Sequence, residues 1–434
     1  MKKYSSYKDS GVKWLGQIPS HWEVKRLASF FTERRVKVSD KDYEPLSVTK
    51  LGIFPQLENV AKTNDGDNRK LVKKGDFVIN SRSDRKGSSG VSNLDGSVSL
   101  INIVLEPRKS VVPSFVNYLL KSYRFVEEYY RNGHGIVADL WTTRYDEMKM
   151  IKLGIPPLSE QTLIATYLDT ATAKIDAAIL QQQKMIDLLK ERKQIIINSA
   201  VTRGLDKNVK MKDSGVEWIG EIPEHWEVKP IIHFKSTEKN AFVDGPFGSN
   251  LKSEHYIENG DVYVIESGMV TTGKFINKGF KTISLSHFKT IERSECKPGD
   301  VIIAKIGAKF GMAAELPNIQ KKCVVSGNSL KITLNQKIML NTLFVYYMGL
   351  AKTKNGFIGL YQETAQPALS LGGLNNMNFP VPPIEEQKEI VDFMNFKLDK
   401  IDRAITNCDR QIALLQERKQ IIINDVVTGK VKVG

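Results

Sequence analysis

The stretch PPLSEQTLIATYLDTATAKIDAAILQQQKMIDLLKERKQIIIN occupies residues 156–198, and PPIEEQKEIVDFMNFKLDKIDRAITNCDRQIALLQERKQIIIN occupies residues 382–424. The last eight residues of the two stretches are identical. Each stretch opens with a Pro-Pro pair, which can precede a helix but cannot continue one. The sequence therefore predicts the same long helix twice in one chain.

Both predicted helices carry side chains at alternating spacings of four and three residues, which is typical of a coiled-coil seam with polar interruptions. About 40 residues of helix would extend about 60 Å, and a single such helix would leave its apolar stripe exposed. We therefore expect the two helices to pair as an antiparallel coiled coil. The alternative is two ordinary amphipathic helices, each lying on its own domain. The expected seam is formed by Ile164, Leu168, Ala171, Ile175, Ala178, Gln182, Met185 and Leu189 in the first helix, and by Ile390, Met394, Lys397, Ile401, Ala404, Cys408, Gln411 and Leu415 in the second.

A second repeat lies upstream of each helix. Residues 9–25 read DSGVKWLGQIPSHWEVK, and residues 213–229 read DSGVEWIGEIPEHWEVK, with 13 of 17 positions matched. Between the repeated blocks, residues 28–155 and 232–381 diverge heavily. Similar frames that carry different inserts suggest one scaffold with two specificities. Duplication followed by drift is the simpler alternative, but drift alone should not leave eight consecutive residues unchanged.

The variable blocks have the pattern of mixed sheet-and-turn domains. Short β-rich runs at 76–80, 98–105, 262–266 and 300–304 alternate with turns rich in Gly, Asn and Ser, and helices are expected only over 113–131 and 341–354. The predicted fold class is α+β, with two globular mixed α/β domains separated by two long helices in a pseudo-two-fold repeat. The expected boundaries are 1–155 for the first domain, 156–203 for the first helix, 204–381 for the second domain, and 382–434 for the second helix and tail.

The composition narrows the class of protein. The chain has 434 residues, 41% of them hydrophobic, and a net charge of +14. Its length suggests two or three domains with cores of their own. No apolar run approaches 18 residues, and the three cysteines lie far apart, so we expect a cytoplasmic protein with reduced thiols. The moderate basic excess allows a polyanionic partner.

Catalytic motifs are missing from the sequence. The Pro-Pro pairs lack the polar and aromatic neighbours with which a DNA methyltransferase holds a flipped base. Residues 268–275 resemble a P-loop, but Phe275 stands where a Ser or Thr would bind Mg²⁺. No His-Glu-x-x-His zinc motif is present. We therefore predict a chain that catalyses nothing and holds neither a metal nor a cofactor.

Features suited to binding DNA lie in the loops. The loop at 81–90 combines arginine, which can pair with guanine, with serine for phosphates and glycine for close backbone approach. A solvated basic loop is an equally good interpretation of this segment alone. The second block offers a tight turn at 244–252 and a basic loop at 305–311. The candidate DNA-binding residues are Ser81, Arg82, Arg85, Lys86, His134, Arg144, Ser249, Asn250, Lys252, Lys305, Lys309, Gln362 and Gln366.

Five motifs together resemble the specificity subunit (HsdS) of Type I restriction-modification systems. They are SGVEWIGEIPEHWEV at 214–228, DGPFGSNL at 244–251, KPGDVIIAKIG at 297–307, FPVPPIEEQKEIV at 379–391 and LLQERKQIIINDVVTGKV at 414–431. The resemblance spans nearly the whole chain. The first copy departs from the pattern at 201–204, where VTRG replaces VTGK, and its variable block lacks a GPFGSNL turn.

The resemblance implies a division of labour. Each variable block would be a target recognition domain that reads one half of a split double-stranded DNA sequence. The helices would hold the two domains apart, so that they meet half-sites about one helical turn (~34 Å) apart, and would dock two methyltransferase subunits. Those subunits would carry S-adenosylmethionine and methylate adenine. Restriction motor-nuclease subunits would use ATP and Mg²⁺.

Two other functions stay open at this point. A standalone DNA-modifying enzyme with degenerate motifs would bind S-adenosylmethionine by itself. A duplicated structural adaptor would give no salt-dependent binding to DNA.

Overall fold

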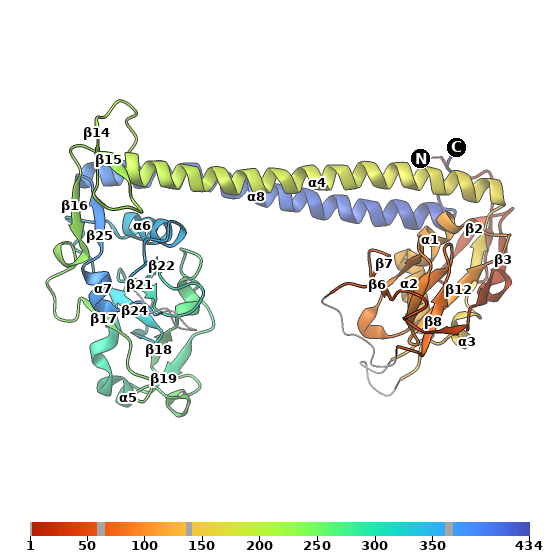
Figure 1. Ribbon diagram of the computed structural model, residues 1–434, viewed down its shortest axis with the longest axis horizontal. Coiled ribbons are helices and arrows are strands. Elements are labelled where there is room, and N and C mark those ends of the chain that lie inside the picture. The colour runs from red at the N-terminus through yellow and green to blue at the C-terminus, as the bar shows by residue number, and fades with distance from the viewer. Residues whose placement is uncertain (1, 59–65, 136–140, 361–367) are drawn as a thin grey trace. The chain divides into compact units, whose positions relative to one another are not determined.

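The computed structural model describes residues 2–58, 66–135, 141–360 and 368–434. The chain forms two compact units, unit 1 with residues 1–184 and 407–434, and unit 2 with residues 185–406. Each unit contains one β-rich domain, a part of helix α4 (Leu158–Arg203) and a part of helix α8 (Ile384–Val427) (Figure 1). The predicted α+β class is confirmed. No helix in the described part of the chain is long and apolar enough to span a membrane.

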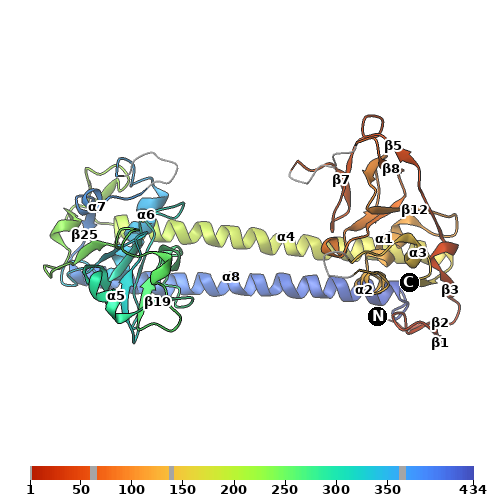
Figure 2. The ribbon, with the colours of Figure 1, turned by 90° about the horizontal axis from the view of Figure 1, so that it is seen from below.

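The two long helices pack together inside each unit (Figure 2). In unit 1 the first half of α4 meets the second half of α8, where Lys419 Nζ lies 2.7 Å from Asp176 Oδ2. In unit 2 the second half of α4 meets the first half of α8, where Lys193 Nζ lies 2.6 Å from Asp402 Oδ1. The pairing is therefore antiparallel, as predicted.

Every second position of the expected seam lies on the buried face of the helices, as predicted. Six of the expected residues are buried and seven are half-buried. The buried ones are Ile164, Leu168, Ile175, Ile390, Met394 and Ile401, and the half-buried ones are Ala171, Ala178, Gln182, Leu189, Ala404, Cys408 and Leu415.

The alternate seam positions lie one residue later than the sequence analysis placed them. Ile186 is buried, whereas its neighbour Met185 is 47% exposed. In α8 the buried residue is Leu398, and the expected Lys397 is exposed. The expected Gln411 is likewise exposed, beside the half-buried Ile412. This phase of the heptad places larger apolar side chains in the interface, which explains the shift.

The domain of unit 1 is built from antiparallel sheets. One four-stranded sheet has the order β10-β9-β12-β4, a three-stranded sheet has the order β11-β8-β5, and three two-stranded pairs are β1-β2, β6-β7 and β13-β3. The expected run at 98–105 is split between β11 and β12. The strands are β1 (Tyr7–Asp9), β2 (Gln17–Pro19), β3 (Glu23–Arg26), β4 (Phe31–Glu33), β5 (Lys37–Val38), β6 (Leu46–Val48), β7 (Ile53–Pro55), β8 (Arg69–Val72), β9 (Phe77–Asn80), β10 (Ser89–Val91), β11 (Gly96–Ser99), β12 (Asn102–Pro107) and β13 (Lys152–Ile155).

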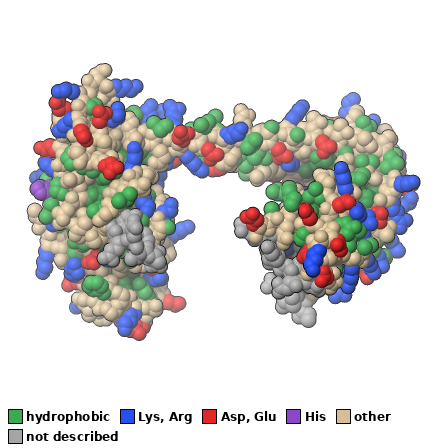
Figure 3. Space-filling model, in the orientation of Figure 1, with side chains coloured by type: hydrophobic (Ala, Val, Ile, Leu, Met, Phe, Trp, Pro, Cys, Tyr) green, Lys and Arg blue, Asp and Glu red, His purple; other side chains and the backbone are tan. Residues whose placement is uncertain are grey.

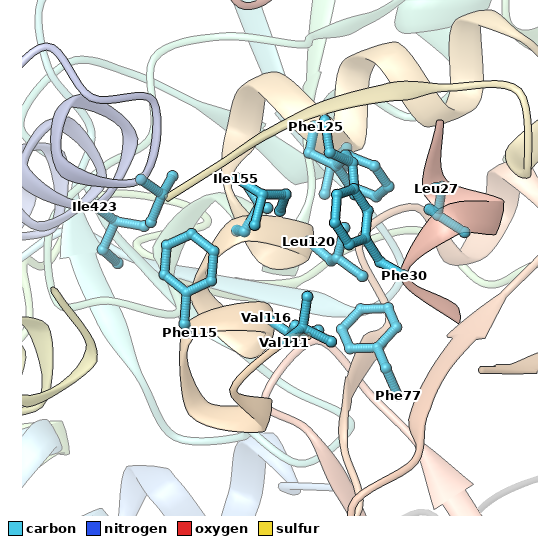
Figure 4. Close-up of a cluster of buried hydrophobic side chains, with 14 of the residues drawn as sticks. Leu27, Phe30, Phe77, Val111, Phe115, Val116, Leu120, Phe125, Ile155 and Ile423 are labelled. Carbon is cyan, nitrogen blue, oxygen red and sulfur yellow. The ribbon is translucent and has the colours of Figure 1, made fainter. Parts of the chain in front are cut away.

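Three short α-helices in the described part of the chain complete this domain. The helix expected over 113–131 is two helices, α1 (Pro113–Lys121) and α2 (Tyr123–Arg131), because Ser122 takes an extended conformation and its side chain caps α2. The third helix is α3 (Tyr145–Met148). Figure 4 shows Ile423 of α8 in one hydrophobic cluster with Phe115 and Ile155, so this end of α8 belongs to the core of the domain.

The domain of unit 2 has two four-stranded sheets, with the orders β17-β24-β21-β22 and β19-β18-β23-β20. Only β18 and β23 run parallel among the described strand pairs. The strands are β14 (Met211–Asp213), β15 (Glu221–Pro223), β16 (Glu227–Pro230), β17 (Phe242–Asp244), β18 (Val262–Ile265), β19 (Lys281–Ile283), β20 (Glu295–Cys296), β21 (Val301–Ala304), β22 (Ala313–Glu315), β23 (Lys322–Val325), β24 (Ser329–Ile332) and β25 (Asn378–Val381). The helices are α5 (Leu285–Thr290), α6 (Asn341–Thr353) and α7 (Leu371–Asn375).

A carboxylate in the first turn of each long helix anchors the repeated upstream block. Glu160 of α4 accepts a hydrogen bond from Trp22 Nε1 at 3.2 Å and lies 2.7 Å from His21 Nε2. Glu386 of α8 accepts from Trp226 Nε1 at 3.0 Å. Both tryptophans are fully buried. The repeated His-Trp pair is therefore structural in both units.

Candidate nucleic-acid interface

The end of β9 in unit 1 is the point where the candidate loops meet. The amide of Ser83 donates to the Trp141 carbonyl at 3.1 Å, and the amide of Thr143 donates to the Ser81 carbonyl at 3.0 Å. Arg82 forms a β-bridge with Thr142. The sequence presented these as separate segments about 60 residues apart, and the structure joins them into one surface.

Unit 2 repeats this arrangement at the end of β21. The amide of Leu369 donates to the carbonyl of Lys305 at 3.0 Å, and Ile306 forms a β-bridge with Ala368. Both units therefore place the loop after a buried central strand beside the segment that leads toward the long helix. Gln362 and Gln366 lie outside the described residues.

The basic loop of unit 1 presents its cations in different directions. Arg82 and Arg85 are exposed, and Arg85 Nε lies 3.5 Å from Asp84 Oδ2. Lys86 Nζ instead lies 2.7 Å from Glu127 Oε2, so a neighbouring carboxylate offsets its charge. Ser81 is buried.

Two further candidate DNA-binding residues, His134 and Arg144, contact Glu147. His134 Nε2 lies 3.4 Å from Glu147 Oε1, and the backbone amide of Arg144 donates to Glu147 Oε2 at 2.8 Å. Both His134 and Arg144 are exposed, and His134 also forms a β-bridge with Thr142. This contact brings the pair to the same side of the domain as Arg82.

Arg82 and Arg85 stand at a polar pocket of about 550 Å³. Its lining also includes the amides of Gln56, Asn80 and Asn102. None of these three residues was predicted from the sequence. Asn80 had a detectable signal, since it ends a buried strand whose counterpart in the other unit ends in Ala, whereas Gln56 had none.

A buried cation also lines this pocket. Arg69 is 5% exposed and its Nε donates to Ser97 Oγ at 2.8 Å. Burial lowers the pKa of Arg69 from its ordinary value, and the charge of Asp40 acts in the opposite direction. The positive charge of Arg69 therefore lies beneath the pocket without being exposed.

In unit 2 the turn at 244–252 packs tightly against the sheet. A Cβ at Gly245 would lie 1.9 Å from the Ser326 carbonyl oxygen, so only glycine fits. Asp244 lies 3.5 Å from Lys305 Nζ and 3.4 Å from Arg293 Nη2. These contacts hold the turn beside the basic loop at 305–311.

The tip of that turn is exposed. Ser249 and Asn250 both lie on the surface, and the Asn250 carbonyl lies 3.0 Å from His287 Nε2. Lys252 is exposed, and its Nζ lies 3.7 Å from Glu254 Oε1.

Lys309 adds positive charge near the base of α6. Burial, followed by the charge of Lys309, lowers the pKa of Lys352, whose ammonium lies 3.3 Å from the centre of the Phe310 ring. Lys309 itself is exposed. On the face drawn in Figure 3, basic and acidic side chains are interspersed over each unit. Charges of both signs are therefore mixed on this face, and local geometry must supply any specificity there.

A family model described as the Type I restriction modification DNA specificity domain matches residues 19–185 and 247–416. The Type I restriction enzyme MjaVIII specificity subunit of Methanocaldococcus jannaschii is 24% identical, over 98% of this chain and 97% of its own. The EcoKI specificity subunit of Escherichia coli (strain K12) is 22% identical, over 90% of this chain and 86% of its own.

Solved structures share the fold. A chain from a structural study of complex assembly and conformational transition in the type I R-M system aligns with a TM-score of 0.72 at 13% identity, covering 95% of this chain and 99% of that one. The crystal structure of the HsdS subunit from Thermoanaerobacter tengcongensis gives a TM-score of 0.52 at 16% identity, covering 95% of this chain and 98% of that one.

Proposed function

Because the chain belongs to the family of Type I restriction-modification DNA specificity subunits, we propose that each of its two units reads one half of a bipartite DNA target. The chain is a specificity subunit and so a non-catalytic component of the restriction enzyme. One observation carries the proposal. Each unit presents a loop from the end of an equivalent central strand, β9 in unit 1 and β21 in unit 2, but the residues in the two loops differ. Equal scaffolds with unequal loops suit two half-sites of different sequence.

The long helices supply a docking surface for two methyltransferase subunits in this proposal. In each unit the two helices keep large apolar side chains exposed, and a partner that covered them would remove this apolar surface from water. S-adenosylmethionine would then be bound by the methyltransferase subunits, and ATP and Mg²⁺ by the motor-nuclease subunits. The exposed side chains are Leu158, Leu163, Leu180, Leu414 and Ile421 in unit 1, and Met185, Leu188, Ile195 and Phe396 in unit 2.

The test is to map methylated adenines in cells that express the methyltransferase subunits with and without this chain. We expect a bipartite motif that depends on the chain. A motif without a gap, or methylation that is unchanged when the chain is removed, would contradict the proposal. The purified chain alone should bind no S-adenosylmethionine in equilibrium dialysis, whereas a standalone modifying enzyme would bind it.

A further inference from the structure

Two large apolar side chains stand at the tips of tight turns, one in each unit. Leu51 lies between β6 and β7 in unit 1 and is 85% exposed, and Phe247 lies in the turn at 244–252 in unit 2 and is 72% exposed. These are the two highest exposed fractions among the large hydrophobic side chains that the structure describes. Tight turns favour Gly, Asn, Asp, Ser or Pro, so the turns themselves do not require a leucine or a phenylalanine at their tips.

The turn that carries Leu51 is fixed against the end of the basic loop of unit 1. Thr49 Oγ1 accepts the backbone amide of Leu51 at 3.1 Å, and the amide of Ser89 donates to the Thr49 carbonyl at 3.1 Å. Lys50, next to the tip, is exposed and lines the same pocket as Arg82. The apolar tip therefore stands on a fixed turn at the edge of a basic surface.

The turn that carries Phe247 is anchored at both of its ends. Pro246 is buried, and a Cβ at Gly327 would lie 2.7 Å from its carbonyl oxygen, so backbone packs closely against backbone there. At the other end, Leu251 is buried in a hydrophobic cluster with Phe288. The four residues between these two anchors are all exposed. The ring of Phe247 is therefore presented to solvent from a turn that is held in place.

Cations and hydrogen-bonding groups surround the tip in unit 2 as well. Lys305 and Arg293 both reach Asp244 at the start of this turn, so two positive charges face one carboxylate. Ser249 and Asn250, within the exposed tip, add a hydroxyl and an amide. A surface that docks a protein would instead join several apolar side chains into one contiguous patch. A single apolar tip among cations suits a DNA duplex, which is anionic outside and apolar within its base stack.

We propose that Leu51 and Phe247 are wedges, each of which inserts between two base pairs of the half-site that its unit reads. The inference rests on the proposed function and deepens it. Leucine and phenylalanine are among the side chains that unstack a base step when a protein kinks DNA. The cations beside each tip hold the neighbouring phosphates. Because pyrimidine–purine steps unstack most easily, each wedge adds a sequence preference without a hydrogen bond to a base.

The experiment uses duplexes that carry 2-aminopurine, an adenine analogue whose fluorescence rises when it loses its stacking neighbours, at successive positions of the mapped motif. The full chain is assembled with its methyltransferase subunits. The methylated adenines are left out of the series, because a methyltransferase takes its target base out of the stack by itself. We expect a rise in fluorescence at one step of each half-site. Leu51→Ala should abolish the rise in one half-site and Phe247→Ala in the other, each with a loss of affinity of about fivefold or more.

A conservative variant and two controls accompany these substitutions. Phe247→Leu keeps an apolar wedge and should retain most of the rise in fluorescence. Val36→Ala in unit 1 and Ile257→Ala in unit 2 remove exposed apolar side chains on other segments, and both should behave as the wild type. All of these side chains are exposed, so their truncation leaves the cores intact.

The inference is overturned if the wild-type complex shows no rise outside the methylated adenines, or if Leu51→Ala and Phe247→Ala leave the rise in place. It is also overturned if either variant changes both half-sites together. A variant that loses its methyltransferase subunits in size-exclusion chromatography would make the tip a protein contact, which also overturns the inference. If the wild-type complex selects no bipartite motif at all, the proposed function fails instead.

Discussion

Asp300 and Lys331 form a buried ion pair in the central sheet of unit 2. Their side chains are 3% and 8% exposed, and Lys331 Nζ lies 3.2 Å from Asp300 Oδ2. The carboxylate also accepts the backbone amide of Lys297 and the hydroxyl of Thr333. In unit 1 the equivalent Asp76 pairs with Arg34, which directly follows β4. The sequence repeats Gly-Asp before each strand, as Gly75-Asp76 and Gly299-Asp300, and so places the aspartate. The tertiary structure supplies its cation.

Removing the aspartate should destabilise unit 2 strongly. Asp300→Ala leaves Lys331 charged and buried without its partner, which costs about 3 kcal/mol. Hydrogen exchange of the β21 and β24 amides measures the loss. Glu292→Ala, an exposed change, is the control and should have little effect. Adding Lys331→Met to Asp300→Ala should recover part of the stability; a double variant weaker than the single one would contradict the electrostatic explanation.

The exposed arginines at the unit 1 pocket should contribute to binding of one half-site only. Arg82→Ala and Arg85→Ala should each weaken DNA binding, and where the arginine neutralises a phosphate, its removal should reduce the salt dependence of the affinity by about one ion. Titration of a labelled duplex at several salt concentrations measures both effects, with Lys109→Ala as the control. Preference for the second half-site should stay intact, and a joint shift of both would argue against independent units.

At the scale of elements, two neighbouring residues of α4 should differ strongly in their contribution to stability, because only one of them lies in the seam between the long helices. Ile186→Ala should destabilise unit 2 by about 2–4 kcal/mol, since it removes a buried branched side chain. The adjacent Met185→Ala should change the free energy of unfolding by less than about 0.5 kcal/mol. Urea unfolding followed by helix circular dichroism distinguishes them. A larger loss for Met185→Ala than for Ile186→Ala would mean that the coiled coil has the phase first expected from the sequence.

The C-terminal ends of the long helices are closed by glycines with positive φ. Gly429 has φ +73°, and a Cβ there would lie 2.3 Å from Pro19 Cδ. Gly204, at the end of α4, has φ +70°, and a Cβ added there would meet the side chain of Glu386. The VTRG departure in the first copy is thus accommodated, because the glycine has moved one residue along and α4 ends at Arg203.

Gly429→Ala should loosen the contact between α8 and the first domain. The substitution carries a left-handed backbone cost of about 1 kcal/mol and a steric cost of about 1–3 kcal/mol against Pro19. Gly16→Ala separates the two effects, because Gly16 has φ +66° with open space around it. Thermal unfolding should therefore show a clearly larger loss for Gly429→Ala. A similar loss of thermal stability for both variants would mean that Pro19 and its surroundings move to make room for the new methyl group at no energetic cost.

At the scale of the whole molecule, the proposed function makes helix length a determinant of the target. Inserting one heptad after Lys184 in α4 and another after Thr406 in α8 keeps the seam in phase. It lengthens each helix by about 10 Å, the rise of about three base pairs. We expect the gap in the methylated motif to grow by about three base pairs while both half-sites keep their sequence. Adenine methylation mapping reads out both; an unchanged gap would contradict a spacer role.

Local sequence signals were enough to predict the duplication, the antiparallel long helices and the strands within 76–80 and 300–304. These features depend on short-range patterns: Pro-Pro entries, heptad spacing, and a glycine turn before a run of branched residues. The same signals indicated that the loops after those strands carry basic and polar residues. The repeat also shows the His-Trp pairs, but it does not show that the carboxylates of Glu160 and Glu386 bind them.

Only the tertiary structure decided which distant residues meet. It joined Arg82 to Thr142, set Asn80 opposite Asn102, and placed Lys305 beside Asp244. It also chose Ile186 over Met185 for the helix seam. Strand register and helix phase are fixed by the packing of whole surfaces, and a shift of one residue changes which side chains face each other. No local pattern in the sequence says which strands pair, or in which register.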